Sequence, residues 1–215
     1  MEHLLALYAL PYDPDYPVVC YDERPCFLIG DTLAPLPMVS GTPTKQHYAY
    51  EKNGSCALLA AIEPLTGQRV GQVHAQRTKR EYTLLCLELA ARYPQAIKIR
   101  LVQDNLNTHN ASSFYAHLPA DEAFALAQRF EFIYTPKTAS WLNMIECEFA
   151  VLSRQCLNRR IPTIDQLRTE VLALLAERAS KQIRIHWQFS IQAARSTLNR
   201  SYTKVNTENE KYKDT

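Results

Sequence analysis

The chain has 215 residues, of which 47% are hydrophobic and 21% charged, a composition typical of one globular domain that excludes a disordered or coiled-coil chain as the main architecture. Its 5 glycines form neither a Gly-x-Gly-x-x-Gly nor a Gly-Lys-Ser/Thr motif, so nucleotide-binding loops of those kinds are excluded. The apolar runs fall far short of the ~20 residues that a membrane span needs, and the first residues lack the features of a signal peptide. We therefore expect a cytoplasmic protein with no membrane partner.

The charges divide the chain into an acidic body and a basic C-terminal part. Residues 1–148 hold 12 lysines and arginines against 16 aspartates and glutamates, whereas residues 149–202 hold 9 against 3. Such a basic region fits a polyanionic partner, but it also fits a solvated basic helix face, and charge alone does not choose between them.

The first half of the chain is typical of an antiparallel meander. A Pro-rich entry over residues 11–17 cannot be a helix or a central strand. Strands are expected over residues 18–21, 47–51, 56–62 and 69–75, with a further short apolar stretch at 26–29 and a loop at 31–45. Asn53-Gly54 predicts a hairpin turn between the second and third of these strands.

The second half alternates helices and strands. Thr78 and Glu81 form a capping-box pattern that predicts the start of a helix, and Thr163 with Gln166 predicts another. Further elements are expected as strands at 97–103 and 130–134 and as helices at 110–118, 120–129 and 141–157. The whole pattern predicts an α/β fold, in which a mixed sheet of a meander followed by parallel strands is flanked by helices.

Three acids lie where the chain leaves these elements. Asp22 ends the first strand, Asp104 ends the 97–103 strand, and Glu146 lies early in the helix after the 130–134 strand. Mg²⁺ prefers oxygen ligands and takes one or two carboxylates per ion, so three carboxylates can hold a pair of ions for phosphoryl transfer. Because the chain has 22 acidic residues, spacing alone does not single out this triple.

The residues around these acids closely resemble the signatures of a known family. Residues 104–109 read Asp-Asn-Leu-Asn-Thr-His, and residues 138–146 read Thr-Ala-Ser-Trp-Leu-Asn-Met-Ile-Glu. They resemble the second-acid and third-acid motifs of the insertion sequence 630 family, the bacterial DDE transposases of the Tc–mariner superfamily. Residues 19–23 resemble the first-acid segment, and matches near the C-terminus extend the resemblance over about residues 8–202.

The resemblance implies an RNase H-like fold and a catalytic, metal-binding triad of Asp22, Asp104 and Glu146 on two Mg²⁺ or Mn²⁺ ions. It implies cleavage of DNA at element ends and strand transfer into target DNA, typically at a TA dinucleotide, by a nucleoid-associated protein that is a homodimer on DNA. Further motif positions are expected to support the ligands or contact DNA: Asn105, Asn107, His109 and Asn143.

Two neighbouring acids compete with the triad. Glu23 follows Asp22 on an extended segment, so the two side chains point in opposite directions and only one can reach the cluster. Glu146 and Glu148 flank the apolar stripe of their helix on its two sides, so helix geometry does not choose between them. The family motif chooses Glu146, and we expect Glu146→Gln to abolish strand transfer and Glu148→Gln to keep most of it.

The resemblance also suggests a division of the chain. We expect an N-terminal linker segment at 1–16, a catalytic core at 17–160, a basic helical extension at 161–202 and a disordered polar tail at 203–215. Three arginines just beyond the catalytic helix are expected to contact DNA: Arg154, Arg159 and Arg160. Trp141 is expected to anchor the core rather than to stack on a base.

The chain departs from the family at its start, because Met1 lies about twenty residues before Asp22 and no helix-turn-helix segment precedes the core. End-specific binding is therefore expected to need a separate helix-turn-helix polypeptide or a fusion made by frameshifting, unless this is a truncated copy. Two alternatives to a transposase stay open: an RNase H-like metal-dependent nuclease without strand transfer, and an inactive remnant.

Overall fold

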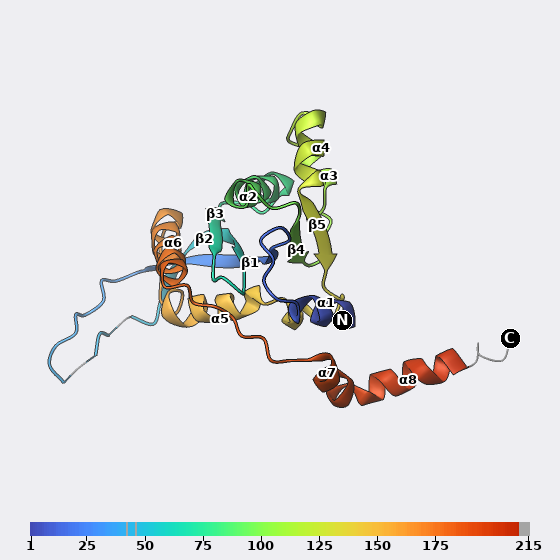
Figure 1. Cartoon of the computed structure of the whole chain (residues 1–215). Coiled ribbons are helices and arrows are strands. Elements are labelled where there is room, and N and C mark those ends of the chain that lie inside the picture. The colour runs from blue at the N-terminus through green and yellow to red at the C-terminus, as the bar shows by residue number, and fades with distance from the viewer. Residues whose placement is uncertain (42, 46, 211–215) are drawn as a thin grey trace.

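A five-stranded sheet in the order β3-β2-β1-β4-β5 forms the centre of the molecule in a computed structural model that describes residues 1–41, 43–45 and 47–210 (Figure 1). β1 (Val18–Asp31) pairs antiparallel with β2 (Tyr50–Ile62), which pairs antiparallel with β3 (Arg69–His74). On its other side β1 pairs parallel with β4 (Ile99–Gln103), and β4 pairs parallel with β5 (Phe130–Tyr134). The predicted mixed sheet, a meander followed by parallel strands, is confirmed.

Helices cover both faces of this sheet. One face is covered by α2 (Lys79–Arg92), α3 (Ser112–Tyr115) and α4 (Ala120–Gln128). The opposite face is covered by α1 (Glu2–Tyr8), α5 (Ile145–Gln155), α6 (Ile164–Ser180) and α7 (Ile191–Thr197). In Figure 1, α2 lies above the sheet and α5 below it, while α8 (Asn199–Glu210) projects away from the body. Among the described residues, no helix combines the length and the apolar character needed to cross a membrane.

The central strand β1 serves both cores because successive side chains of a strand point to opposite faces. Val19 and Tyr21 are buried on the α2 side, whereas Cys20 is buried on the α5 side. The same alternation sends Asp22 and Glu23 to opposite faces, as the sequence predicted.

Both chain ends differ from their predicted form. The expected linker at 1–16 contains α1, whose leucines Leu4, Leu5 and Leu7 are buried in the core on the α5 side. This apolar run is too short to show a helical period, and its packing against the body stabilises it. Residues 203–210 of the expected disordered tail continue α8, and residues 211–215 lie outside the described part of the chain.

The predicted hairpin at Asn53-Gly54 is wrong. β1 and β2 pair continuously past this point, and their register shifts between Leu28 and Ile29, which face Gly54 and Lys52. Asn53 is the extra residue of a bulge, and its side-chain amide donates to the Pro162 carbonyl at 3.0 Å. Gly54 has a positive φ of +109°, which a hairpin turn would also need. Here this backbone angle belongs to a bulge inside β2.

Candidate active site at the carboxyl edge of the sheet

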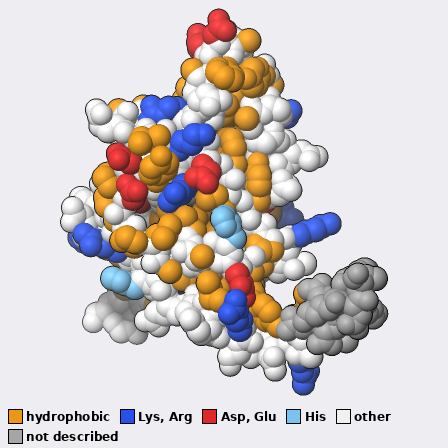
Figure 2. Space-filling view, turned by 45° about the vertical axis from the view of Figure 1, so that its right-hand side comes forward, with side chains coloured by type: hydrophobic (Ala, Val, Ile, Leu, Met, Phe, Trp, Pro, Cys, Tyr) orange, Lys and Arg blue, Asp and Glu red, His pale blue; other side chains and the backbone are white. Residues whose placement is uncertain are grey.

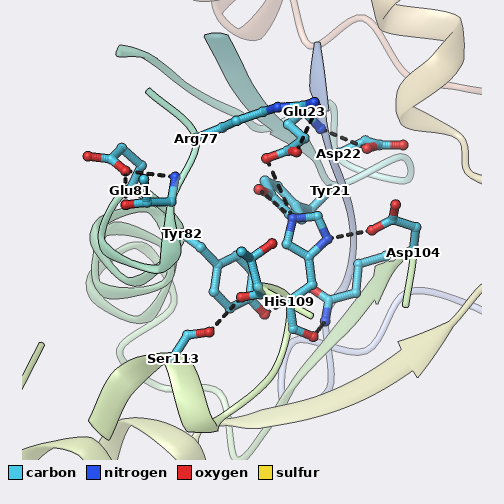
Figure 3. Close-up of polar contacts among 12 residues, drawn as sticks. Tyr21, Asp22, Glu23, Arg77, Glu81, Tyr82, Asp104, His109 and Ser113 are labelled. Carbon is cyan, nitrogen blue, oxygen red and sulfur yellow. Dashed lines mark hydrogen bonds and ion pairs between the residues drawn. The ribbon is translucent and has the colours of Figure 1, made fainter. Parts of the chain in front are cut away.

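The first two acids of the predicted triad meet at one edge of the sheet. β1 and β4 are parallel, with Cys20 opposite Val102, so Asp22 and Asp104 each lie two residues beyond this pair. Figure 3 shows both carboxylates on the same side of β1, with Glu23 on the other. Asp104 directly follows the carboxyl end of β4, where ligands of α/β sheets collect. The prediction that Asp22 ends the first strand is wrong: β1 continues to Asp31, and Asp22 lies inside it opposite Ala60 of β2, just past the segment that pairs with β4.

Glu146 is brought toward the same edge by the start of α5. It is exposed in the first turn of that helix, just after the buried Asn143. The Asn143 side-chain amide donates to the backbone carbonyl of Tyr21 at 2.8 Å, which ties the start of α5 to the residue before Asp22. The Tyr8 hydroxyl adds a bond of 2.9 Å to the Leu142 carbonyl.

Burial and two neighbouring charges act on the carboxylate of Asp22. Burial raises the pKa of Asp22 to about 6, and the negative charges of Asp104 and Glu146 add to this rise against the opposing hydrogen bond from the Glu23 backbone. A bound cation would relieve such repulsion, and three carboxylates are the hard oxygen donors that Mg²⁺ and Mn²⁺ take. The donor set therefore fits the divalent ions that the sequence predicts.

One oxygen of Asp22 and one oxygen of Asp104 have partners inside the chain. One oxygen of Asp22 accepts from the Glu23 backbone N–H at 2.7 Å, and one oxygen of Asp104 contacts Nδ1 of His109. Within the described residues, no three His, Cys, Asp or Glu side chains are arranged closely enough to form a metal site. A cation would therefore compete with these internal bonds.

Of the other motif residues, His109 and Asn143 lie in the interior, whereas Asn105 and Asn107 are exposed on the loop after β4. The His109 ring contacts Asp104 directly, and the carboxylates of Asp104 and Glu23 raise its pKa to about 9 although burial alone would lower it. Figure 3 shows this ring between the two acids.

The structure separates Glu146 from Glu148. Glu148 has an exposed fraction of 1% and forms ion pairs with Arg69 at 3.0 Å and with Arg178 at 2.6 Å. Burial acts to raise the pKa of Glu148, but the hydrogen bonds and charges of the two arginines together outweigh burial. The pKa of Glu148 therefore lies below its usual value. Glu148 is thus a buried, ion-paired residue. Its arginine partners lie 79 and 30 residues away along the chain, so no local sequence pattern predicts this pairing.

The three arginines expected to contact DNA differ in their surroundings. Arg154 is exposed and bonds a backbone carbonyl one turn earlier in α5, whereas Arg159 pairs with Glu170. Arg160 pairs with Asp31 and donates to the carbonyls of His47 and Ala49, so its guanidinium holds the chain segment between β1 and β2. The DNA contact of the three arginines stays a prediction, and Figure 2 shows basic and acidic side chains interspersed on the face in view.

The prediction that Trp141 anchors the core is wrong. Its exposed fraction is 47%, and its ring packs edge-on against Phe189 at a centroid distance of 5.3 Å. The core position in this segment belongs to the next residue, Leu142, which is fully buried. An exposed indole five residues before Glu146 adds an aromatic surface to this part of the molecule.

Solved structures of transposase complexes share the fold of this chain. The Mos1 mariner paired-end complex with Mn shares the fold with a TM-score of 0.51 and 14% identity, covering 87% of this chain and 61% of that one. The Mos1 transposase paired-end complex with the left transposon end gives a TM-score of 0.56 and 13% identity, covering 85% and 55%. The Mos1 strand transfer complex gives a TM-score of 0.52 and 12% identity, covering 84% and 56%.

The chain thus spans just over half of the length of these transposases, and at such identities the likeness shows a shared RNase H-like fold. No curated protein matches the chain. The family described as DDE superfamily endonuclease matches residues 17–168, which include all three acids of the edge. The chain therefore belongs to the DDE superfamily endonuclease family.

Proposed function

We propose that the chain is the catalytic part of a transposase of the insertion sequence 630 type, which cuts DNA at element ends and transfers the cut strand into target DNA. One observation carries the proposal: the β1–β4 register and the Asn143–Tyr21 bond direct Asp22, Asp104 and Glu146 to one edge of the sheet. Burial is the largest cause of the raised pKa of Asp22, and the smaller contributions from the charges of Asp104 and Glu146 support their proximity.

Asp22, Asp104 and Glu146 are the residues we propose as ligands of two Mg²⁺ or Mn²⁺ ions. When bound, such a pair activates a water or a 3′-hydroxyl and stabilises the leaving oxygen in an in-line displacement. The chain's own residues arrange the ligands: His109 holds one oxygen of Asp104, and Asn143 fixes the start of α5 beside β1. The Mn in a Mos1 complex of similar fold agrees with this choice of ion.

DNA is the proposed partner, both as element ends and as a TA-containing target. The Mos1 complexes of similar fold are named for a transposon end and for strand transfer. We propose that a helix-turn-helix polypeptide or fused segment recognises the element ends, that two copies act together on DNA, and that the protein works at the nucleoid. The segment 17–160 is the proposed catalytic core, and 161–202 is its basic extension.

A plasmid assay tests the function without knowledge of the element ends. Supercoiled plasmid and a labelled duplex with free 3′-hydroxyls are incubated with the protein and Mn²⁺. We expect nicked plasmid together with label joined to plasmid, and neither product with Asp104→Asn. Asp121→Asn, which alters an exposed acid in the first turn of α4, is the matched control and should keep both products.

The same assay separates the alternatives. Nicking without joining would favour an RNase H-like nuclease that lacks strand transfer. If neither nicking nor Mn²⁺ binding is detected, the inactive remnant is the better account.

A further inference from the structure

The His109 ring lies between two carboxylates on different elements. Its Nδ1 contacts an oxygen of Asp104 after β4, and its Nε2 lies 3.6 Å from an oxygen of Glu23 on β1 (Figure 3). Carboxylate oxygens accept hydrogen bonds, so each ring nitrogen faces an acceptor. This arrangement connects Glu23 to Asp104 through one imidazole.

Glu23 is well placed to act on this ring rather than on solvent. Its side chain is only 8% exposed, and its second carboxylate oxygen accepts from Arg77 at 3.0 Å. Arg77 is 54% exposed and extends across the site from the segment before α2, as Figure 3 shows. Both oxygens of Glu23 therefore have partners, and the carboxylate is fixed in its orientation toward His109.

Aromatic rings hold the imidazole from its remaining sides. Tyr82 stacks on it with a centroid distance of 5.1 Å and an interplanar angle of 27°, and Tyr21 meets it edge-on at 5.1 Å and 71°. The side chain of Gln103 donates to the His109 backbone carbonyl at 2.7 Å. Packing therefore fixes the ring plane, and the Tyr21 hydroxyl also lies 3.4 Å from Nε2.

We propose that Glu23 is a positioning residue of the active site, which acts through His109 to hold the Asp104 carboxylate in its ligand orientation. The inference rests on the proposed function, since it takes Asp104 to be a metal ligand. Glu23 and Asp104 lie at opposite nitrogens of one packed ring, so Glu23 fixes the position of the imidazole, and the imidazole holds one oxygen of Asp104 in one rotamer for a cation. Partners of this kind typically change metal affinity by about 10- to 100-fold when removed.

A double-mutant cycle on Mn²⁺ affinity, measured by titration calorimetry, tests this role. We expect Glu23→Gln, which keeps the side chain's shape, to weaken Mn²⁺ binding about tenfold. In the His109→Ala background the same substitution should change the affinity by less than about twofold, because the connection is already broken. Glu88→Gln, which alters a partly buried carboxylate on α2 bonded to Gln72 and Arg92, should leave Mn²⁺ binding unchanged.

The cycle distinguishes positioning from a simple effect of charge. If Glu23→Gln weakens Mn²⁺ binding equally with and without His109, the carboxylate acts on the cation directly, and the inference is overturned. No change in the wild-type background overturns it as well. Asp104→Asn in the same titration tests the proposed metal role separately. If the wild type binds Mn²⁺ and Asp104→Asn binds it equally well, Asp104 is not a metal ligand, and the proposed function loses this support whatever Glu23→Gln does.

A second readout needs no metal. In nitrogen NMR spectra of the metal-free chain, the His109 ring signals are identified by their loss in His109→Ala. We expect Glu23→Gln to shift them and Glu88→Gln to leave them in place. Unshifted signals would show that Glu23 does not control the ring, whatever the stability of the variant.

Discussion

Two glutamates on α5 show how surroundings assign different roles to identical side chains. Glu146 is exposed at the edge of the sheet, whereas Glu148, two residues later, is buried between Arg69 and Arg178. The Glu148 carboxylate accepts three hydrogen bonds from two arginines, and the positive charges of these arginines disfavour a metal cation beside it. The structure therefore supplies the distinction that helix periodicity left open.

Paired substitutions separate the two roles. We expect Glu146→Gln to abolish Mn²⁺-dependent nicking and to melt like the wild type. Glu148→Gln leaves the fully buried Arg69 without its charge partner, so it should cost about 3–5 kcal/mol of stability while its folded fraction keeps nicking. Thermal melting and plasmid nicking at a temperature where both variants are folded check this, and the reverse ranking would contradict the assignment.

Trp141 provides a second test at this scale. An exposed indole near the proposed active site can stack on an unpaired base, an interaction worth about 1–3 kcal/mol. We expect Trp141→Ala to weaken binding of a labelled single-stranded oligonucleotide at least several-fold and Trp141→Phe to keep part of the affinity. Trp187→Phe, in a ring packed against Tyr8, is the control, and equal losses at both positions would argue for a general loss of packing.

At the scale of elements, the sequence predicted helix starts and short strands well. It did not predict the extent of strand pairing, and the hairpin expected at Asn53-Gly54 was wrong. The capping box of α2 forms as expected, with the Glu81 carboxylate accepting from the Thr78 backbone at 2.8 Å, because both partners lie within one turn. β5 was also predicted with its observed bounds. The length of β1 and β2 was missed because it depends on pairing with a strand distant in sequence, from Cys20 with Ile62 to Asp31 with Tyr50.

The same reason explains which parts of the site were predictable. The three acids of the proposed triad lie in short sequence motifs, so the motifs are enough to predict them. The burial of Glu148 depends on arginines on β3 and α6, and the contact between Glu23 and His109 crosses 86 positions, which no local pattern records. Propensity and periodicity describe neighbours in sequence, and these contacts exist only after the sheet has formed.

Gly54 tests the interpretation of the bulge. A Cβ at this position meets nothing within 4 Å, so the cost of Gly54→Ala comes from the backbone angle of +109°. We expect a loss of about 1–3 kcal/mol in the free energy of unfolding. Denaturant unfolding measures this, with Ser55→Ala on the next, exposed residue as control; equal stability of both variants would contradict a strained bulge.

At the scale of the whole molecule, net charge is a poor guide to a DNA surface. The basic excess of residues 149–202 includes arginines that hold the protein together, as Arg160 does with Asp31. We expect Arg154→Ala to weaken DNA binding uniformly across sequences and to lower the slope of log affinity against log salt by about 1. Arg160→Ala should instead lower the melting temperature and leave that slope unchanged, and a lowered slope would place Arg160 on the DNA surface.

The N-terminal helix α1 meets α7 and α8 in an exposed polar contact. Both oxygens of Glu2 in α1 accept from Arg195 in α7, at 2.7 and 2.8 Å, and the Tyr202 hydroxyl of α8 donates to one of them. The hydrogen bond from Arg195 is the largest cause that lowers the pKa of Glu2 to about 2. Because this pKa lies below the ordinary value of 4.5, the contact contributes fully above pH 4.5 and is lost as the pH falls toward 2.

We expect this contact to restrain α7 and α8 against the body. Glu2→Gln should therefore speed tryptic cleavage at Arg195 and Arg200, and high salt should have the same effect on the wild type, since exposed ion pairs are screened. Glu51→Gln, an exposed glutamate on β2, should leave the cleavage rate unchanged. Cleavage at the same rate in Glu2→Gln and the wild type would mean that apolar packing, rather than this ion pair, holds the C-terminal helices to α1.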